Sequence, residues 1–177
     1  METQGWGTGH IDPFWNDEYK QLNYRQEKFN NPKDLTRWRS EGYVHPDSHF
    51  TGAMCDMRSP QPSWNNQLIN WAASAFNITN IGTSYYCMST GVILPLHKDI
   101  YSRYIELFGC KLEDIVRILV MPEDWCSGHY LELAGVAYTN WRAGDYYWWY
   151  GDTPHMAANI GTENRYTIQI TGHVDGK

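Results

Sequence analysis

The side chains in this sequence that are best able to hold a metal ion are two histidines and one aspartate. His97 and Asp99 stand two positions apart at the end of the apolar run LPLHKDIY, and His155 follows a proline well downstream. If the backbone is extended at His97, alternate side chains point the same way, so His97 and Asp99 face one cavity. Two imidazoles and one carboxylate on one side of a metal leave its opposite positions open, which is a donor set suited to divalent iron. We therefore predict that His97, Asp99 and His155 are metal ligands and catalytic residues.

Other groups of possible metal ligands are weaker. His45 and His49, in the stretch HPDSH, are the next candidates for a metal site. Cys126 with His129 is weaker still, because two residues in a loop do not complete a site. The four cysteines are scattered without a Cys-x-x-Cys pair, so neither a zinc site nor a disulfide framework is indicated.

An anion-binding pair follows the second histidine. In the stretch RYTIQITG, Arg165 and Thr167 alternate with Tyr166 and Ile168, so a guanidinium and a hydroxyl share one face of a strand. A buried arginine is costly unless it meets an anion, and its planar fork binds a carboxylate through two hydrogen bonds. The alternative is an arginine that pairs with the nearby Glu163 at the surface.

Helices and an irregular arm are expected in the first half of the chain. Residues 1–62 are rich in Gly, Asn, Pro, Asp and aromatic residues without a sustained period. They predict an irregular N-terminal arm with one or two short helices, able to cover the site. Residues 63–76 carry an apolar stripe at helical spacing, with Ser63 as the N-cap.

Short strands dominate the rest of the chain. From residue 78 onward, about eight β-like runs are separated by Gly, Pro and Asp, and one helical run ends at Gly109. This order predicts a mainly β fold with a few helices, built as two packed antiparallel sheets: a double-stranded β-helix (jelly roll, cupin-like). We expect one domain over residues 1–177, with the β-helix core spanning 78–174.

Taken together, these residues resemble the iron(II)/2-oxoglutarate-dependent dioxygenase superfamily. The resemblance covers roughly residues 80–172 and includes the turn Ala143-Gly144-Asp145 in RAGDYYWW. It implies iron(II) held by the two histidines and the aspartate, O2 as a co-substrate, and 2-oxoglutarate with its distal carboxylate on Arg165 and Thr167. The implied reaction hydroxylates an unactivated C–H bond of a small-molecule or amino-acid/peptide substrate, while 2-oxoglutarate is decarboxylated to succinate and CO2.

The resemblance does not extend to one substrate class. Prolyl hydroxylases usually anchor the oxoacid with lysine, where this chain offers Arg165. Aspartyl/asparaginyl β-hydroxylases look similar in the run DIVRILV, but their animal members lack the carboxylate that Asp99 supplies here. Halogenating members also replace that carboxylate, so Asp99 favours hydroxylation.

Arg117, inside the apolar run DIVRILV, needs a partner for its charge. The partner is either a structural carboxylate or the 1-carboxylate of the oxoacid, which makes Arg117 a candidate cofactor-binding residue.

Several aromatic residues are candidates for substrate contacts. Alternation along a strand indicates that only one of Trp148 and Trp149 faces inward, and each aromatic has core packing as its alternative role. The predicted substrate-binding residues are Tyr85, Tyr101, Tyr130 and Trp148.

Composition excludes some partners and leaves two other functions open. A net charge of −6 argues against a nucleic-acid partner. No apolar window is long enough to cross a membrane. No secretory signal is recognisable, so a cytoplasmic protein is expected.

One alternative function is a cupin-like metal dioxygenase that uses no oxoacid. The other is a non-catalytic β-sandwich binding module, since nine Trp and thirteen Tyr could line a ligand surface.

Overall fold

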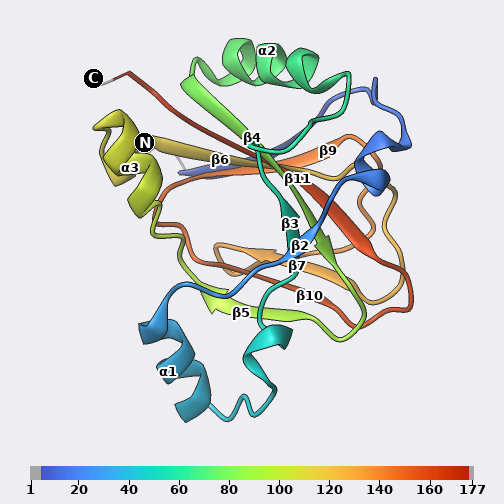
Figure 1. Cartoon of the computed structure of the whole chain (residues 1–177), viewed down its shortest axis with the longest axis vertical. Helices are drawn as coiled ribbons and strands as arrows, with labels where there is room; N and C mark the ends of the chain where they lie inside the picture. Colours follow the sequence, from blue (N-terminus) through green and yellow to red (C-terminus); the bar gives the residue numbers. More distant parts are fainter. Residues whose placement is uncertain (1–4, 176–177) are drawn as a thin grey trace.

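Two antiparallel β-sheets face each other in the computed structural model, which describes residues 5–175 (Figure 1). The larger sheet has seven strands in the order β1-β9-β6-β11-β4-β3-β2. These strands are β1 (Trp6–His10), β9 (Asp145–Tyr150), β6 (Ile115–Val120), β11 (Arg165–His173), β4 (Thr79–Met88), β3 (Ala53–Cys55) and β2 (Arg25–Gln26). The smaller sheet has four strands, in the order β5 (Ile93–His97), β10 (His155–Asn159), β7 (His129–Leu133) and β8 (Val136–Tyr138).

The chain from β4 onward winds repeatedly between the two sheets. β4, β6, β9 and β11 lie in the larger sheet, while β5, β7, β8 and β10 lie in the smaller one. This winding is a double-stranded β-helix, or jelly roll. The predicted fold class is confirmed, and each of these eight strands coincides with a run that the sequence indicated.

Alternation along the strands separates two apolar cores. On β6, Ile118 packs in a cluster with Leu68 and Ala72 of the helix above the larger sheet. Its neighbour Leu119 points between the sheets and packs with Leu131 of β7. The space between the sheets is therefore lined by the side chains that face away from the helix.

Within residues 5–175, three α-helices lie outside the two sheets. α2 (Asn65–Phe76) covers the larger sheet, as Figure 1 shows, and α3 (Ser102–Phe108) ends at Gly109 in the left-handed conformation (φ 63°), as expected of a C-cap. The expectation that Ser63 is the N-cap of this helix was wrong, because the Ser63 hydroxyl donates to the Glu18 carboxylate (2.7 Å) and α2 begins after Ser63.

None of the helices in residues 5–175 has the length and apolar character that a membrane crossing needs.

The first sixty residues contain strands that the sequence did not indicate. β1 pairs with β9 at one edge of the larger sheet, and β3 pairs with β4 and carries β2 at the other edge. β1 escaped prediction because glycine is depleted in strands, yet here glycine is required for close packing. A Cβ on Gly7 would lie 2.8 Å from Nε1 of Trp148.

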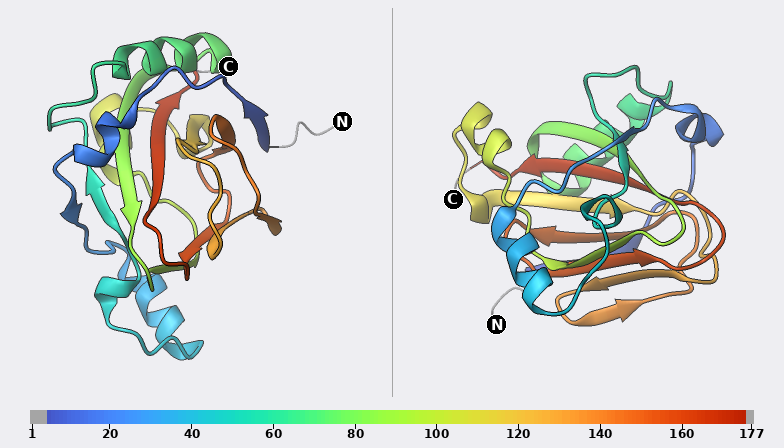
Figure 2. Two further views of the ribbon diagram at one scale, coloured as in Figure 1. Left: turned by 90° about the vertical axis from the view of Figure 1, so that its right-hand side faces the viewer. Right: turned by 60° about the horizontal axis from the view of Figure 1, so that its bottom comes forward.

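The rest of this arm forms α1 (Pro32–Ser40) and the 3-10 helices η1 (Asp17–Gln21) and η2 (Asp47–His49), and a third such helix, η3 (Leu112–Asp114), precedes β6. α1 lies outside the sheets beside β5 (Figure 2). The four cysteines are all free thiols, as the sequence indicated.

Candidate metal centre and its two cavities

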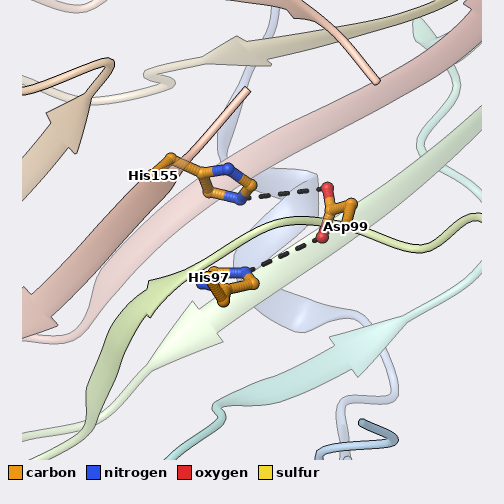
Figure 3. Close-up of side chains that lie close together, drawn as sticks. All are labelled: His97, Asp99 and His155. Carbon is orange, nitrogen blue, oxygen red and sulfur yellow. Dashed lines mark ion pairs between the residues drawn. The ribbon is translucent and has the colours of Figure 1, made fainter. Parts of the chain in front are cut away.

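His97 and His155 meet because β5 and β10 are neighbours in the smaller sheet. The two residues are direct cross-strand partners, at the last position of β5 and the first position of β10. Asp99 lies two residues beyond the end of β5 and turns back toward both rings (Figure 3). Its oxygens lie 3.7 Å from Nε2 of His97 and 3.8 Å from Nε2 of His155. The predicted ligand set therefore converges at one point, with its ligand atoms within 4.8 Å of one another.

Hydrogen bonds orient the two imidazoles for a metal. Nδ1 of His97 donates to the carbonyl of Pro95 (2.9 Å), and Nδ1 of His155 donates to the carbonyl of Thr153 (3.0 Å). A proton on Nδ1 leaves the Nε2 lone pair free to coordinate. Burial, followed by the proximity of His97, lowers the pKa of His155 to about 4, so its ring is neutral at pH 7.

Asp99 is held as a carboxylate. Its Oδ2 accepts a hydrogen bond from the Tyr101 hydroxyl (2.8 Å) and lies 3.4 Å from Nη2 of Arg117. Burial acts to raise the pKa of Asp99, but Arg117, followed by His155, His97 and the Tyr101 hydroxyl, outweighs burial and holds the pKa well below its usual value. Two imidazole nitrogens and one ionised carboxylate fit iron(II).

An inner cavity of about 70 Å³ opens on one side of this centre. Arg165 and Thr167 line it, and each is only 2% exposed. The Arg165 nitrogens Nε and Nη2 and the Thr167 hydroxyl have no hydrogen-bond partner in the structure. Buried polar groups are normally satisfied, so these atoms indicate a missing ligand.

Arg165 has no carboxylate partner among residues 5–175. Its Nη1 contacts Sδ of Met88 (3.1 Å), and its guanidinium lies over the ring of Trp141 (5.4 Å to the centroid). Burial lowers the pKa of Arg165 to about 10, so the group is still charged at pH 7. Glu163, the alternative partner, is exposed and makes no ion pair with it. The surface-pair alternative is therefore wrong.

Arg117 stands between the inner cavity and a second, outer one. Its partner in the structure is the carboxylate of Asp99, and it also donates to Oε1 of Gln169 (3.3 Å). The first of the two alternatives for Arg117, a protein carboxylate, therefore describes its contacts, although the carboxylate belongs to the candidate centre itself.

The outer cavity, of about 190 Å³, lies between the centre and the N-terminal arm. Its wall on the arm side consists of Phe29, Asn30 and Asn31. Sequence reasoning missed these residues, because no period or motif marks them; the aromatic character of the arm was the one available signal. The remaining lining residues are His97, Lys98, Asp99, Ile100, Tyr101 and Arg117.

Two predicted substrate contacts face the wrong side of the larger sheet. Tyr85 donates its hydroxyl to Oδ1 of Asn65 in α2 (2.7 Å), and Trp148 packs on Phe76 (ring centroids 5.8 Å apart). Successive residues of a strand face opposite ways, so their neighbours Tyr86 and Trp149 line the inner cavity instead.

Of the other two predicted substrate-binding residues, Tyr101 lines a cavity and Tyr130 does not. Tyr101 lies at the centre and lines the outer cavity. Tyr130 alternates with the inward-facing Leu131 on β7 and donates to Glu132 (2.7 Å), so the structure does not bring it to either cavity.

The weaker metal candidates do not assemble. His45 and His49 are exposed, with ring centroids 6.2 Å apart, and no third ligand joins them among the residues described. Nε2 of His129 is occupied by the carbonyl of Glu163 (3.1 Å) rather than turned toward Cys126.

Comparison with known proteins finds similar ones by structure alone. No family model matches the chain, and no curated protein matches its sequence. A prolyl-4-hydroxylase from Pseudomonas putida is similar at 14% identity, with a TM-score of 0.57 over 98% of this chain and 95% of that one. The non-heme alpha ketoglutarate dependent carbocyclase SnoK from nogalamycin biosynthesis is similar at 12% identity, with a TM-score of 0.55 over 88% of this chain and 81% of that one. These likenesses agree with the strand order: the chain has the double-stranded β-helix fold.

Proposed function

We propose that this protein is a non-haem iron(II)- and 2-oxoglutarate-dependent oxygenase. It hydroxylates an unactivated C–H bond of a small-molecule or amino-acid/peptide substrate, and 2-oxoglutarate is converted to succinate and CO2. The observation that carries the proposal is the buried Arg165, whose free donors line the same cavity as His97, Asp99 and His155. A charge buried without a partner is costly, and a carboxylate bound there removes the cost.

Two groups of residues that line the inner cavity would have different roles. Iron held by His97, Asp99 and His155 would supply the activation of O2. Arg165 would bind the distal carboxylate of the oxoacid through its fork, and the Thr167 hydroxyl would add a hydrogen bond. The apolar side chains that line the same cavity would exclude water; they belong to Leu94, Leu119, Leu131 and Ala157.

The fold neighbours are consistent with this proposal. One is named a prolyl-4-hydroxylase and the other an alpha ketoglutarate dependent carbocyclase. Their identities of 14% and 12% are too low to carry a substrate to this chain. The substrate is expected to enter the outer cavity, which shares His97 and Asp99 with the inner one.

The test is turnover of 2-oxoglutarate by purified protein with iron(II) and ascorbate, with succinate measured by NMR. Wild type is expected to form succinate slowly without substrate. His97→Ala and His155→Ala should lose iron binding and turnover together, because each removes a ligand, whereas the exposed control His49→Ala should keep both.

Other outcomes would favour the alternatives. Metal-dependent chemistry that is unaffected by Arg165→Met would favour a cupin-like dioxygenase without an oxoacid. Folded protein that binds no iron(II) would favour a binding module. Iron binding and normal turnover in both histidine variants would contradict the assignment.

A further inference from the structure

Asp99 contacts Tyr101 and Arg117 in addition to lying close to the two histidines. The Tyr101 hydroxyl donates to its Oδ2 (2.8 Å), and the same hydroxyl accepts from Nε of Arg117 (3.2 Å). Nη2 of Arg117 reaches the same carboxylate oxygen at 3.4 Å. The three side chains thus form a closed triangle in which Asp99 already has a cationic partner.

The backbone at Tyr101 is strained in a way that serves this triangle. Tyr101 has φ 46° and ψ 22°, a left-handed conformation that is uncommon for a bulky aromatic residue. Strain of this kind persists only where the surroundings over-determine it. Here the phenol is fixed by two hydrogen bonds, and its ring lies over the Arg117 guanidinium (5.1 Å to the centroid).

Arg117 is fixed from its other side as well. Nη1 donates to Oε1 of Gln169 on the neighbouring strand β11 (3.3 Å), and the side chain is 15% exposed. The guanidinium is therefore a built-in positive charge beside the metal centre, lining both cavities.

This charge changes what the centre can bind. The Asp99 carboxylate and the Arg117 guanidinium carry no net charge together, whereas the carboxylate alone would carry one negative charge. A divalent metal that enters without an anion would add its charge to those of Arg117 and Arg165 against the single carboxylate of Asp99, and like charges in a partly buried site repel strongly. A dianionic oxoacid in the inner cavity would balance them.

We propose that Arg117 couples metal binding to anion binding at this centre: the metal binds weakly by itself and tightly together with a dicarboxylate. Linkage makes the coupling reciprocal, so the metal strengthens binding of the anion by the same factor. The inference rests on the proposed metal centre, and it adds that Arg117, held by Tyr101, is a positioning residue that suppresses loading of metal alone.

The experiment measures the Mn(II) dissociation constant with and without saturating 2-oxoglutarate, by electron paramagnetic resonance of free Mn(II). An oxoacid that contacts the metal couples metal binding to oxoacid binding in every variant. The difference in coupling between wild type and Arg117→Met therefore gives the contribution of Arg117. Arg117→Met is expected to bind Mn(II) alone about tenfold more tightly than wild type, and the tightening by 2-oxoglutarate should shrink by about the same factor.

Matched variants separate charge from packing. Arg117→Lys keeps the positive charge, although its ammonium group cannot form the two parallel hydrogen bonds of a guanidinium. Its dissociation constant for Mn(II) alone should stay within about threefold of the wild-type value. Arg103→Met removes an equivalent charge from the exposed face of α3 and should change neither constant. If Arg117→Met does not fold, as judged by circular dichroism, Arg117→Gln takes its place.

The proposal is overturned if Arg117→Met or Arg117→Gln binds Mn(II) alone no more tightly than wild type. Failure of the proposed function gives a different pattern. If 2-oxoglutarate does not bind wild type in the presence of Mn(II), the oxygenase assignment fails, while the Mn(II)-alone comparison still decides the role of Arg117.

Discussion

Arg165 places a guanidinium inside the β-helix, where Nε and Nη2 have no hydrogen-bond partner among the residues that the structure describes. Its neighbours are the sulfur of Met88 and the face of Trp141, which offset the charge only in part. An arginine in such surroundings lowers the stability of the ligand-free protein. We therefore propose that Arg165 is a binding group rather than a structural one, and the two roles can be separated by experiment.

Arg165→Met should stabilise the ligand-free protein and weaken its binding of 2-oxoglutarate. Removal of unsatisfied buried donors is expected to raise the free energy of unfolding of the metal-free, ligand-free protein by about 1–3 kcal/mol. The loss of charged hydrogen bonds should weaken 2-oxoglutarate binding by about 10–100-fold. Urea denaturation and calorimetric titration measure the two effects. A variant that is less stable than wild type and still binds 2-oxoglutarate normally would contradict this role of Arg165.

At the scale of elements, the N-terminal arm supports the end of β5 just before His97. Trp38 of α1 is fully buried, and its Nε1 donates to the carbonyl of Leu96 (3.1 Å). Arg37 donates to the same carbonyl. The ring of Phe29 lies edge-on to His97 (centroids 5.7 Å apart). The arm therefore positions a proposed ligand as well as forming a wall of the outer cavity.

Trp38→Ala should destabilise the protein and loosen the centre together. Deletion of a buried tryptophan side chain costs about 3–5 kcal/mol of unfolding free energy, and Mn(II) affinity should fall because β5 loses its anchor. Val44→Ala, at a side chain that is 86% exposed, is the control and should change stability by less than about 0.5 kcal/mol. Denaturant unfolding with Mn(II) titration measures both; normal Mn(II) affinity in destabilised Trp38→Ala would show that the arm does not position His97.

At the scale of the whole molecule, the centre lies where the two sheets and the arm meet. His97 and His155 belong to the smaller sheet, while Arg117 and Arg165 belong to the larger one. Ligands that join these groups also join the sheets. Bound metal and oxoacid should therefore stabilise the entire β-helix and not only a local loop.

Saturation with Mn(II) and 2-oxoglutarate should raise the melting temperature. A ligand at a hundredfold excess over its dissociation constant adds about 2.7 kcal/mol to the unfolding free energy, and EDTA should reverse the shift. Arg165→Met should lose the part of the shift that depends on 2-oxoglutarate and keep the part that depends on Mn(II). Equal shifts with and without 2-oxoglutarate in wild type would contradict an oxoacid site that bridges the sheets.

Much of this molecule could be predicted from the sequence, because the relevant signals are local. Strand alternation and turn residues indicated the eight strands of the β-helix, and the types and spacing of His97, Asp99, His155 and Arg165 indicated the candidate site. The arm was harder to predict: β1 contains glycines whose value lies in close packing against rings from β9, and that contact is not local.

Only the tertiary structure decided which aromatic side chain faces the cavities and which partner each arginine has. Successive side chains of a strand point to opposite faces of the sheet, so an error of one residue exchanges Tyr85 for Tyr86 and Trp148 for Trp149. The packing of the sheets decides which face lies toward the cavities. Asp99 pairs with Arg117, whereas Arg165 pairs with no carboxylate among the described residues. These pairings depend on strand order and register, which the sequence pattern does not give. The sequence by itself determined the kind of chemistry available, whereas the fold determined which charges are already satisfied.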